Sequence, residues 1–491
     1  MGRHKKEIVI DNILDRRKSG YYSTPKIVAD FISYEMLKLN PFGKNVLDPC
    51  VGKEELLDTF YNNNKVIYSF DIIDFGNHKK SIFRNEDFIE YYNNLKTPLL
   101  FSNNQDKINY DYIIANPPYN CHEVDYIKNN KKYLLEIFSE IGVSNLYSMF
   151  LYAIIDIAKE GTLIGIITLD SFLTSYAHKT LREKILTTCS IHHLILCPTD
   201  LFLDQNADVR TCIIILQKGK KYQKEILTMN RSDNKKDFYQ KLINKEFIEV
   251  DINDFVLTNE RDNREIIIDV PKDIINLFHF DRLGELFSCL TGISTGDDKK
   301  YISKEKNDTF IFPFYKNPGT RRFYTEPDGF LHKDFIKLGE KISNFIVRNK
   351  NFLFKEGITC SSMGVSFGAC YLPPNSTFGV NANIICDNED IWWLLAYLNS
   401  RLVTYFVRGI LIRSNMITSG YVSRIPLLPF NEDVKNKLSQ ISKFAYNNKI
   451  KNDKLLESIS EIDLIIFNWL NLSDNIIKHI NDFCSNLIKR T

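Results

Sequence analysis

Four consecutive residues, Asn116-Pro117-Pro118-Tyr119, carry the groups best suited to chemistry. The asparagine amide oxygen can accept a hydrogen bond from an amine, and the stiff Pro-Pro backbone can aim the Pro117 carbonyl as a second acceptor. An aromatic amine is a poor nucleophile because its lone pair is conjugated with the ring. Hydrogen bonds from the amine to two acceptors reduce that conjugation and expose the lone pair, as direct methylation requires. Tyr119 adds a face on which a flat base can stack. An ordinary Pro-Pro turn after an asparagine is the competing interpretation.

The apolar run before the tetrapeptide predicts where it lies. Residues 112–115, Tyr-Ile-Ile-Ala, have the composition of a buried strand. The tetrapeptide should therefore follow the carboxyl end of a strand in an open sheet, where such folds bind ligands. An earlier strand, 45–48, ends in Asp48 and is followed by Pro49-Cys50-Val51-Gly52 and a helix. Strand, Gly-containing turn and helix form the opening of a nucleotide-binding βαβ unit.

Two acidic residues come between these strands. Asp71 ends a strand over 66–70, a position from which a carboxylate can accept hydrogen bonds from ribose hydroxyls. Asp87 offers a carboxylate for an adenine amino group, beside a Phe88 ring that could stack on the purine. Taken singly, each acidic residue is as readily a helix cap or a surface charge. Their shared place at strand ends, ahead of Asn116, favours a nucleotide site.

Three further stretches border this predicted site. Tyr22-Ser23-Thr24-Pro25 begins a helix, with Thr24 a candidate N-cap and Pro25 the first helical residue. Residues 121–141 are polar and predict a mobile loop over the site. Phe202, between strands over 191–196 and 211–216, is either a lid on the core or a second stacking face for a base.

Composition bounds the class of protein. With 491 residues the chain is long enough for two or three domains, and its net charge of +2 means that a phosphate-binding surface must come from segregated charge. The ten cysteines form no CxxC pair and the nine histidines show no zinc-ligand spacing. We therefore expect no metal, reduced thiols and a cytoplasmic location. The most apolar late stretch, 391–410, contains two arginines, which argues against a membrane span.

Composition shifts along the chain predict its organisation. Segments of five kinds follow one another: an N-terminal arm (1–20), a catalytic domain (21–220), a charged joint (221–275), a target-recognition domain (276–430) and a helical element (431–491). In the fourth segment basic and aromatic residues interleave, as in surfaces that position nucleic-acid phosphates, although a solvated face with core aromatics has the same pattern. The candidate cations are Lys316, Arg321, Arg322 and Arg401.

These motifs, in this order, resemble the gamma group of N6-adenine DNA methyltransferases, the TaqI-like type. The resemblance covers nearly the whole chain and rests on short motifs at 22–25, 46–57, 71, 87–88, 116–119, 145–147, 168–173, 202 with 209–211, 292–296, 398–401 and 420–426. It implies an α/β fold: a Rossmann-like S-adenosylmethionine-dependent domain with a mixed, mainly parallel seven-stranded sheet, then an α+β DNA-recognition domain. It also implies methylation of a flipped-out adenine in duplex DNA. Whether a separate restriction endonuclease accompanies the chain, and whether the chain acts as a monomer or a weak dimer, stay open at this point.

The resemblance assigns roles residue by residue. Catalysis falls to Asn116, Pro117 and Tyr119, with Tyr119 and Phe202 stacking on the base. Cofactor binding falls to Tyr22, Thr24, Pro25, Asp48, Cys50, Gly52, Asp71, Asp87, Phe88 and Asn116. DNA binding falls to the four cations of the recognition domain.

Glu54 departs from the family pattern, because family members usually have a second glycine there. Its carboxylate could crowd the methionine part of the cofactor, or it could point to solvent from the first helical turn. The first possibility leaves open a DNA-binding protein whose catalysis has decayed. Because related Asn-Pro-Pro-Tyr sites serve other planar nitrogens, an RNA base or a protein glutamine is the alternative substrate.

Overall fold

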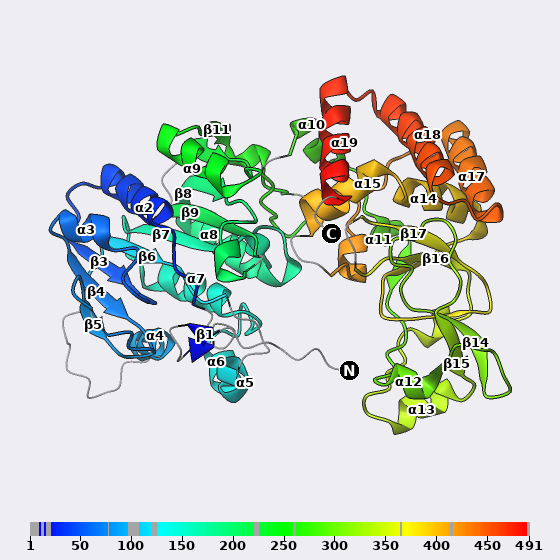
Figure 1. The fold of residues 1–491 in the computed structure, drawn as a ribbon, viewed down its shortest axis with the longest axis horizontal. Coiled ribbons are helices and arrows are strands. Elements are labelled where there is room, and N and C mark those ends of the chain that lie inside the picture. Colours follow the sequence, from blue (N-terminus) through cyan, green and yellow to red (C-terminus); the bar gives the residue numbers. More distant parts are fainter. Residues whose placement is uncertain are drawn as a thin grey trace. The chain divides into compact units, whose positions relative to one another are not determined.

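The chain forms two compact units, Met1–Asp269 and Val270–Thr491, which are described separately (Figure 1). The computed structural model describes residues 9–10, 14–15, 21–76, 78–96, 108–119, 125–207, 209–219, 225–258, 262–268, 270–363, 366–412 and 416–488. Of the predicted N-terminal arm, only β1 (Val9–Ile10) and β2 (Leu14–Asp15) are described, and they pair antiparallel. The rest of that arm lies outside the described residues.

Unit 1 is built on a nine-stranded sheet with the order β11-β10-β8-β9-β7-β6-β3-β4-β5. Its strands are β3 (Asn45–Asp48), β4 (Val66–Phe70), β5 (Ile82–Arg84), β6 (Tyr112–Ala115), β7 (Leu163–Leu169), β8 (Cys189–Leu196), β9 (Thr211–Lys218), β10 (Glu225–Met229) and β11 (Ile248–Asp251). The run from β7 to β5 is wholly parallel, and β9 is antiparallel to both of its neighbours. The predicted mixed, mainly parallel α/β sheet is confirmed.

Both faces of this sheet are covered, because the apolar strand residues point alternately to two cores. In β6, Ile113 and Ala115 join one core, while Tyr112 and Ile114 join the other. The first core contains α4 (Phe88–Lys96), α7 (Leu146–Ile157) and α8 (Lys179–Thr188). The second contains α2 (Lys26–Leu39), α3 (Asp58–Asn62) and α9 (Lys235–Asn244). Because both faces of the central strands are buried, their sequences are continuous apolar runs.

Two sequence-based expectations need correction. The sheet has nine strands rather than seven, because the charged segment assigned to a joint supplies β10, α9 and β11. β11 lies at the sheet edge with half-buried or exposed residues, so it lacks the apolar pattern that marks the central strands. The expected mobile loop over 121–141 instead contains α5 (Asp125–Asn129) and α6 (Lys131–Ile137). Ile127 and Leu134 anchor these two short helices in the first core.

Unit 2 contains two four-stranded sheets, ordered β12-β19-β16-β17 and β13-β15-β14-β18. Their strands are β12 (Ser288–Leu290), β13 (Ile302–Ser303), β14 (Phe310–Tyr315), β15 (Gly329–His332), β16 (Gly357–Cys360), β17 (Ala369–Leu372), β18 (Thr377–Phe378) and β19 (Asn383–Ile385). The accompanying helices are α14 (Asn388–Leu398), α15 (Arg401–Tyr405), α17 (Glu432–Asn447), α18 (Asp453–Leu470) and α19 (Asp474–Ile488). The last three occupy the segment expected to be helical.

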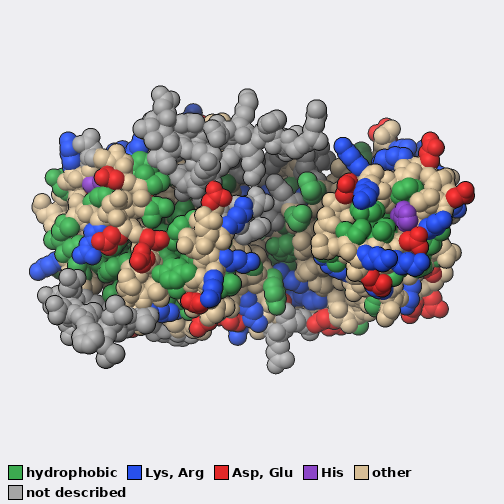
Figure 2. Space-filling view, turned by 90° about the horizontal axis from the view of Figure 1, so that it is seen from below, with side chains coloured by type: hydrophobic (Ala, Val, Ile, Leu, Met, Phe, Trp, Pro, Cys, Tyr) green, Lys and Arg blue, Asp and Glu red, His purple; other side chains and the backbone are tan. Residues whose placement is uncertain are grey.

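The surface of unit 2 carries mixed charge. Figure 2 looks onto the face with the short helices α12 (Asp298–Tyr301) and α13 (Phe335–Lys341), where Lys and Arg side chains alternate with Asp and Glu. Residues 391–410, the most apolar late stretch of the sequence, lie in α14, α15 and the π-helical turn that follows. Among the described helices, none combines the length and the apolar character needed to span a bilayer.

Close packing of α2 on the sheet depends on Gly165 in the middle of β7. A Cβ at this position would lie 2.4 Å from Met36 Sδ and 2.6 Å from Ile32 Cγ2, both on α2. We therefore expect Gly165→Ala to lower the free energy of unfolding by about 1–3 kcal/mol through overpacking. Denaturant unfolding measures this loss.

A double-mutant cycle tests the cause. Met36→Ala should cost less stability in the Gly165→Ala background than in the native chain, because it removes the clashing sulfur. Strict additivity of the two changes would show that α2 does not approach β7 as closely as described.

Candidate active site

A pocket opens at the carboxyl ends of four adjacent parallel strands, β3, β4, β5 and β6. It encloses about 730 Å³, part of it open to solvent. The chain runs β3 to β4 to β5 in one direction across the sheet, and β6 to β7 in the other. The order therefore reverses between β3 and β6, and Cys50 and Asn116 border the pocket at that point. Open α/β sheets bind ligands at such a switch point.

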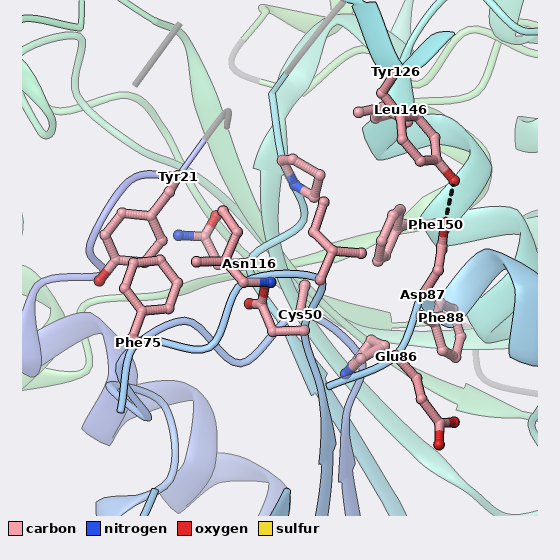
Figure 3. Close-up of a pocket in the computed structure, with 15 residues that line it drawn as sticks. Tyr21, Cys50, Phe75, Glu86, Asp87, Phe88, Asn116, Tyr126, Leu146 and Phe150 are labelled. Carbon is pink, nitrogen blue, oxygen red and sulfur yellow. Dashed lines mark hydrogen bonds between the residues drawn. The ribbon is translucent and has the colours of Figure 1, made fainter. Parts of the chain in front are cut away.

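The pocket has an acidic rim and apolar walls (Figure 3). Its lining residues are Tyr21, Pro49, Cys50, Asp71, Ile72, Ile73, Phe75, Glu86, Asp87, Phe88, Asn116, Pro118, Tyr126, Leu146 and Phe150. Of the ten predicted cofactor residues, five are in this set: Cys50, Asp71, Asp87, Phe88 and Asn116. The remaining five, Tyr22, Thr24, Pro25, Asp48 and Gly52, are not among the lining residues.

Asn116 is held in one orientation by the segment before α2. Its Nδ2 donates to the Tyr22 carbonyl at 2.7 Å and to Thr24 Oγ1 at 2.9 Å. Because a carbonyl can only accept, the amide group must turn its NH2 toward this segment. Both amide hydrogens are thereby used, and the amide oxygen is the atom of the side chain left to accept from a ligand.

This contact corrects the role expected for Thr24. Helix α2 begins at Lys26 with Pro25 as its N-cap, and no side chain caps it. The Thr24 hydroxyl binds Asn116 instead, although Thr-Pro before an apolar helix is a common capping signature. The partner of Thr24 is 92 residues away in the sequence, so local pattern could not reveal it.

Three aromatic rings meet beside the tetrapeptide. Tyr119 stacks on Tyr22 with ring centroids 5.5 Å apart and an interplanar angle of 20°. Phe202 meets Tyr119 edge-on at 6.1 Å and is fully buried. Phe202 is thus packed in the second core, and its role as a second stacking face for a base stays a prediction. One face of Tyr119 is occupied by Tyr22.

The acidic residues of the first two strands are strongly desolvated. Asp71 accepts from the backbone N–H of Gly52 at 2.9 Å and of Ile73 at 3.0 Å, and burial raises its pKa. Asp48 is fully buried and uses Oδ1 to accept from Cys50 N at 3.1 Å, while no described residue donates to its Oδ2. Burial, together with the nearby Asp71, raises the pKa of Asp48 well above its usual range. A cationic group brought close to Asp48 Oδ2 would relieve this cost.

Asp87 lies at the opposite end of the pocket and has two partners. Its Oδ1 accepts from Ile89 N at 2.8 Å in the first turn of α4, and its Oδ2 accepts from the Tyr126 hydroxyl at 2.6 Å. Phe88, predicted to stack on a purine, is only 1% exposed and packs against Phe150 with centroids 5.5 Å apart. The open apolar surface nearby belongs to Ile72, which is 58% exposed.

Gly52 is needed for both its backbone angle and its lack of a side chain. Its φ is +53°, and a Cβ would lie 2.4 Å from the Tyr21 ring. Tyr21 packs against Phe75 at 5.0 Å and donates its hydroxyl to Glu55. Tyr21 thus lies over the Gly-containing turn and lines the pocket together with Pro49 and Cys50.

Glu54 neither enters the pocket nor points to solvent. It is 3% exposed, and its carboxylate accepts from the backbone N–H groups of Lys79, Lys80 and Ser81 at 3.0–3.1 Å and from Ser81 Oγ at 2.8 Å. Its φ of +61° lies in the left-handed region that a glycine adopts without strain. The backbone therefore keeps the conformation expected of the family glycine, and the side chain fixes the segment before β5.

Several lining residues were not predicted from the sequence, namely Tyr21, Ile72, Phe75, Tyr126, Leu146 and Phe150. Ile72 had a usable signal, because an apolar residue directly after Asp71 at a strand end is positioned for a ligand. Tyr126 was assigned to a mobile loop. Phe150 lies in an apolar helix, and nothing in the sequence pattern distinguishes it from its apolar neighbours. Only the folded arrangement brings α5 and α7 to the strand ends.

The four cations predicted to bind DNA have different surroundings in unit 2. Arg401 pairs with Asp463 of α18 at 2.8 Å, through both its side chain and its backbone N–H. Arg322 is half-buried and donates to the Asn399 carbonyl, and the desolvation of its guanidinium lowers its pKa. Lys316 pairs with Asp298, and exposed Arg321 donates to Thr325 Oγ1 at 2.8 Å. The charged groups of Arg322 and Arg401 are thus engaged within unit 2.

Comparisons with known proteins relate part of the chain to DNA methylases. Residues 82–266 match the family model described as N-6 DNA Methylase. The chain is 30% identical over 204 residues to the Type II methyltransferase M.BanIII of Aneurinibacillus aneurinilyticus, a match covering 36% of this chain and 35% of that protein. The match thus spans about a third of the curated relative's length.

Solved structures with a similar fold cover most of the chain. The Type IIL restriction-modification enzyme MmeI, solved in complex with DNA, matches 98% of this chain and 81% of its own, with a TM-score of 0.61 and 10% identity. The DrdV–DNA complex matches 89% of this chain and 58% of its own, with a TM-score of 0.58 and 10% identity. At such identities the similarity establishes the fold, which here extends over both units.

The Glu54 contacts predict an unequal response to substitution. Glu54→Ala removes the acceptor for residues 79–81 and retains the unfavourable φ, so we expect the free energy of unfolding to fall by about 1–3 kcal/mol. Glu54→Gly removes the same hydrogen bonds but relieves the backbone, so it should be more stable than Glu54→Ala by about 1 kcal/mol. Denaturant unfolding of both variants measures the difference. Equal stability of the two variants would contradict the left-handed conformation at this residue.

Proposed function

We propose that this protein is an S-adenosylmethionine-dependent methyltransferase of the gamma type that methylates adenine N6 in duplex DNA. The observation that carries the proposal is the fixed Asn116 amide at the switch point of the sheet. With its NH2 held by Tyr22 and Thr24, the side chain can present only its oxygen to an exocyclic amine. The match of residues 82–266 to the N-6 DNA Methylase model supports the same chemistry.

The chemistry of the pocket lining fits the proposed cofactor. Asp71 would accept from ribose hydroxyls and Asp87 from the adenine amine, while Ile72 and Phe150 supply apolar surface for the purine. The unpaired Asp48 Oδ2 suits the ammonium group of the methionine part. When bound, the cofactor supplies an electrophilic methyl group.

The target base would lie on Tyr119, close to Asn116. The Asn116 oxygen and the Pro117 carbonyl would accept the two N6 hydrogens, which would leave the nitrogen lone pair free to attack the methyl group in line. The methyl–sulfur bond would break as the N6–carbon bond forms, so that S-adenosylhomocysteine leaves, and one N6 proton would be lost to solvent. Flipping the adenine out of the duplex costs a few kcal/mol. Alignment of amine and methyl group supplies most of the rate. The Tyr22 ring covers one face of Tyr119. The Tyr22 ring therefore has to turn aside before a base can stack on that face.

Unit 2 would recognise the duplex. The support for this role is that structures solved with DNA share the fold over 98% and 89% of this chain. Arg321 and Lys316 lie near the surface and remain candidates for phosphate contacts. For Arg322 and Arg401 we propose a structural role instead. Arg322 donates to the Asn399 carbonyl, and a phosphate contact by Arg401 would leave the buried carboxylate of Asp463 without its partner.

The decisive experiment is to identify the methylated product. The purified protein is incubated with labelled S-adenosylmethionine and unmethylated genomic DNA, which is then digested to nucleosides for mass spectrometry. We expect N6-methyladenine as the labelled product. Asn116→Ala should abolish transfer and leave duplex binding largely intact. Labelling of added RNA or protein in place of DNA, or near-native turnover by Asn116→Ala, would refute the proposal.

The role of Thr24 can be tested separately. Thr24→Val keeps the shape of the side chain but removes the acceptor for Asn116 Nδ2. We expect single-turnover methyl transfer to slow by about 10–100-fold, since one positioning hydrogen bond is lost. Thr24→Ser keeps the hydroxyl and should retain most of the rate. Equal rates for the Val and Ser variants would show that the Asn116 contact is not used.

A further inference from the structure

We propose that Tyr126 is a specificity-determining residue, which fixes the Asp87 carboxylate so that the cofactor site selects a 6-amino purine over a 6-oxo purine. This inference rests on the proposed function and assigns a role to a residue outside the predicted site. It starts from a single contact that Figure 3 shows at the wall of the pocket, between the Tyr126 hydroxyl and Asp87.

The contact joins two elements that are distant in sequence. Tyr126 lies on α5, 39 residues after Asp87, and both residues line the pocket. α5 is anchored next to this contact, because Ile127 is only 2% exposed in the first core. Asn130 donates from its backbone N–H and its Nδ2 to the Tyr126 carbonyl, at 3.1 and 2.9 Å. The tyrosine therefore approaches Asp87 from a fixed backbone.

The direction of the hydrogen bond follows from the chemistry of the pair. Burial raises the Tyr126 pKa, and the nearby Asp87 charge raises it further, so the phenol keeps its proton and donates. A distance of 2.6 Å is that of a short, charge-assisted hydrogen bond. With Ile89 N–H on Oδ1 and the phenol on Oδ2, the carboxylate can no longer rotate freely.

A carboxylate held in this way discriminates between purines. An ionised carboxylate offers about four acceptor positions, of which the two protein donors use two. The remaining positions can accept from an exocyclic amine but repel the carbonyl oxygen of a 6-oxo purine. A site built to pair a donor rejects an analogue that lacks it much more strongly than an apolar pocket rejects a change of size. Tyr126 contributes by preventing the carboxylate from turning away.

The test measures purine selectivity with the whole 491-residue chain. Calorimetry gives the affinities of S-adenosylhomocysteine and S-inosylhomocysteine for the native chain, Tyr126→Phe and Tyr133→Phe. Tyr133 is the matched control, because it packs against the same core from α6 but does not line the pocket. We expect Tyr126→Phe to weaken adenosyl binding by about tenfold and inosyl binding much less, so that the affinity ratio contracts. Tyr133→Phe should leave the ratio unchanged.

A second variant separates selectivity from a general loss of structure. Asp87→Asn should remove or invert the preference for the amino purine, and adding Tyr126→Phe to it should change the ratio no further. An unchanged ratio in Tyr126→Phe, or equal weakening of both ligands, would overturn the inference while the proposed function stood. A native chain that bound neither ligand would instead overturn the proposed cofactor, and this inference with it.

Discussion

The site depends on how the amide nitrogen of Asn116 is held between the Tyr22 carbonyl and the Thr24 hydroxyl. The amide is useful only if its oxygen faces the ligand, and a freely rotating asparagine would offer a donor as readily as an acceptor. This contact requires the correct relative position of two elements. They are β6, which directly precedes Asn116, and α2, which begins two residues after Thr24. The second is positioned by its close approach to β7 at Gly165. Packing in the middle of the sheet thus controls hydrogen bonding at its end.

The first βα turn shows how a carboxylate can replace a glycine. At Glu54 the chain keeps a φ of +61°, which strains any residue with a side chain, and the carboxylate offsets that strain by accepting from residues 79–81. The departure from the family pattern therefore changes how the turn is stabilised while the pocket stays clear. This removes the reason for regarding the site as decayed, because that idea required Glu54 to occupy the place of the cofactor.

How much could be predicted from the sequence depends on whether the deciding contact is local. Asp71, Asp87 and Asn116 were predictable, because each follows a strand of the sheet and parallel strands bring their carboxyl ends together. Contacts between distant segments left no local signal: the Thr24 hydroxyl that binds Asn116, and the Tyr126 phenol that binds Asp87 from a segment expected to be a loop. Arg401 looked like a free cation because its partner, Asp463, is 62 residues away. The edge strand β11 and its neighbour β10 were missed because they lie in a charged segment that lacks the clear alternation of the central strands.

The stacked pair of Tyr22 and Tyr119 suggests how base entry and catalysis can be separated. Turning the Tyr22 ring aside sacrifices its contacts with Tyr119 and Phe202, each worth about 0.5–1.5 kcal/mol. A base that stacks on the freed ring regains about 1–3 kcal/mol. The exchange is thus nearly balanced before any hydrogen bond to N6 forms. Asn116 is held by the Tyr22 backbone carbonyl and not by its ring, so the ring can turn about its side-chain bonds while the carbonyl stays in place. Tyr22 can therefore uncover the Tyr119 ring for a base while its backbone carbonyl still holds the Asn116 amide.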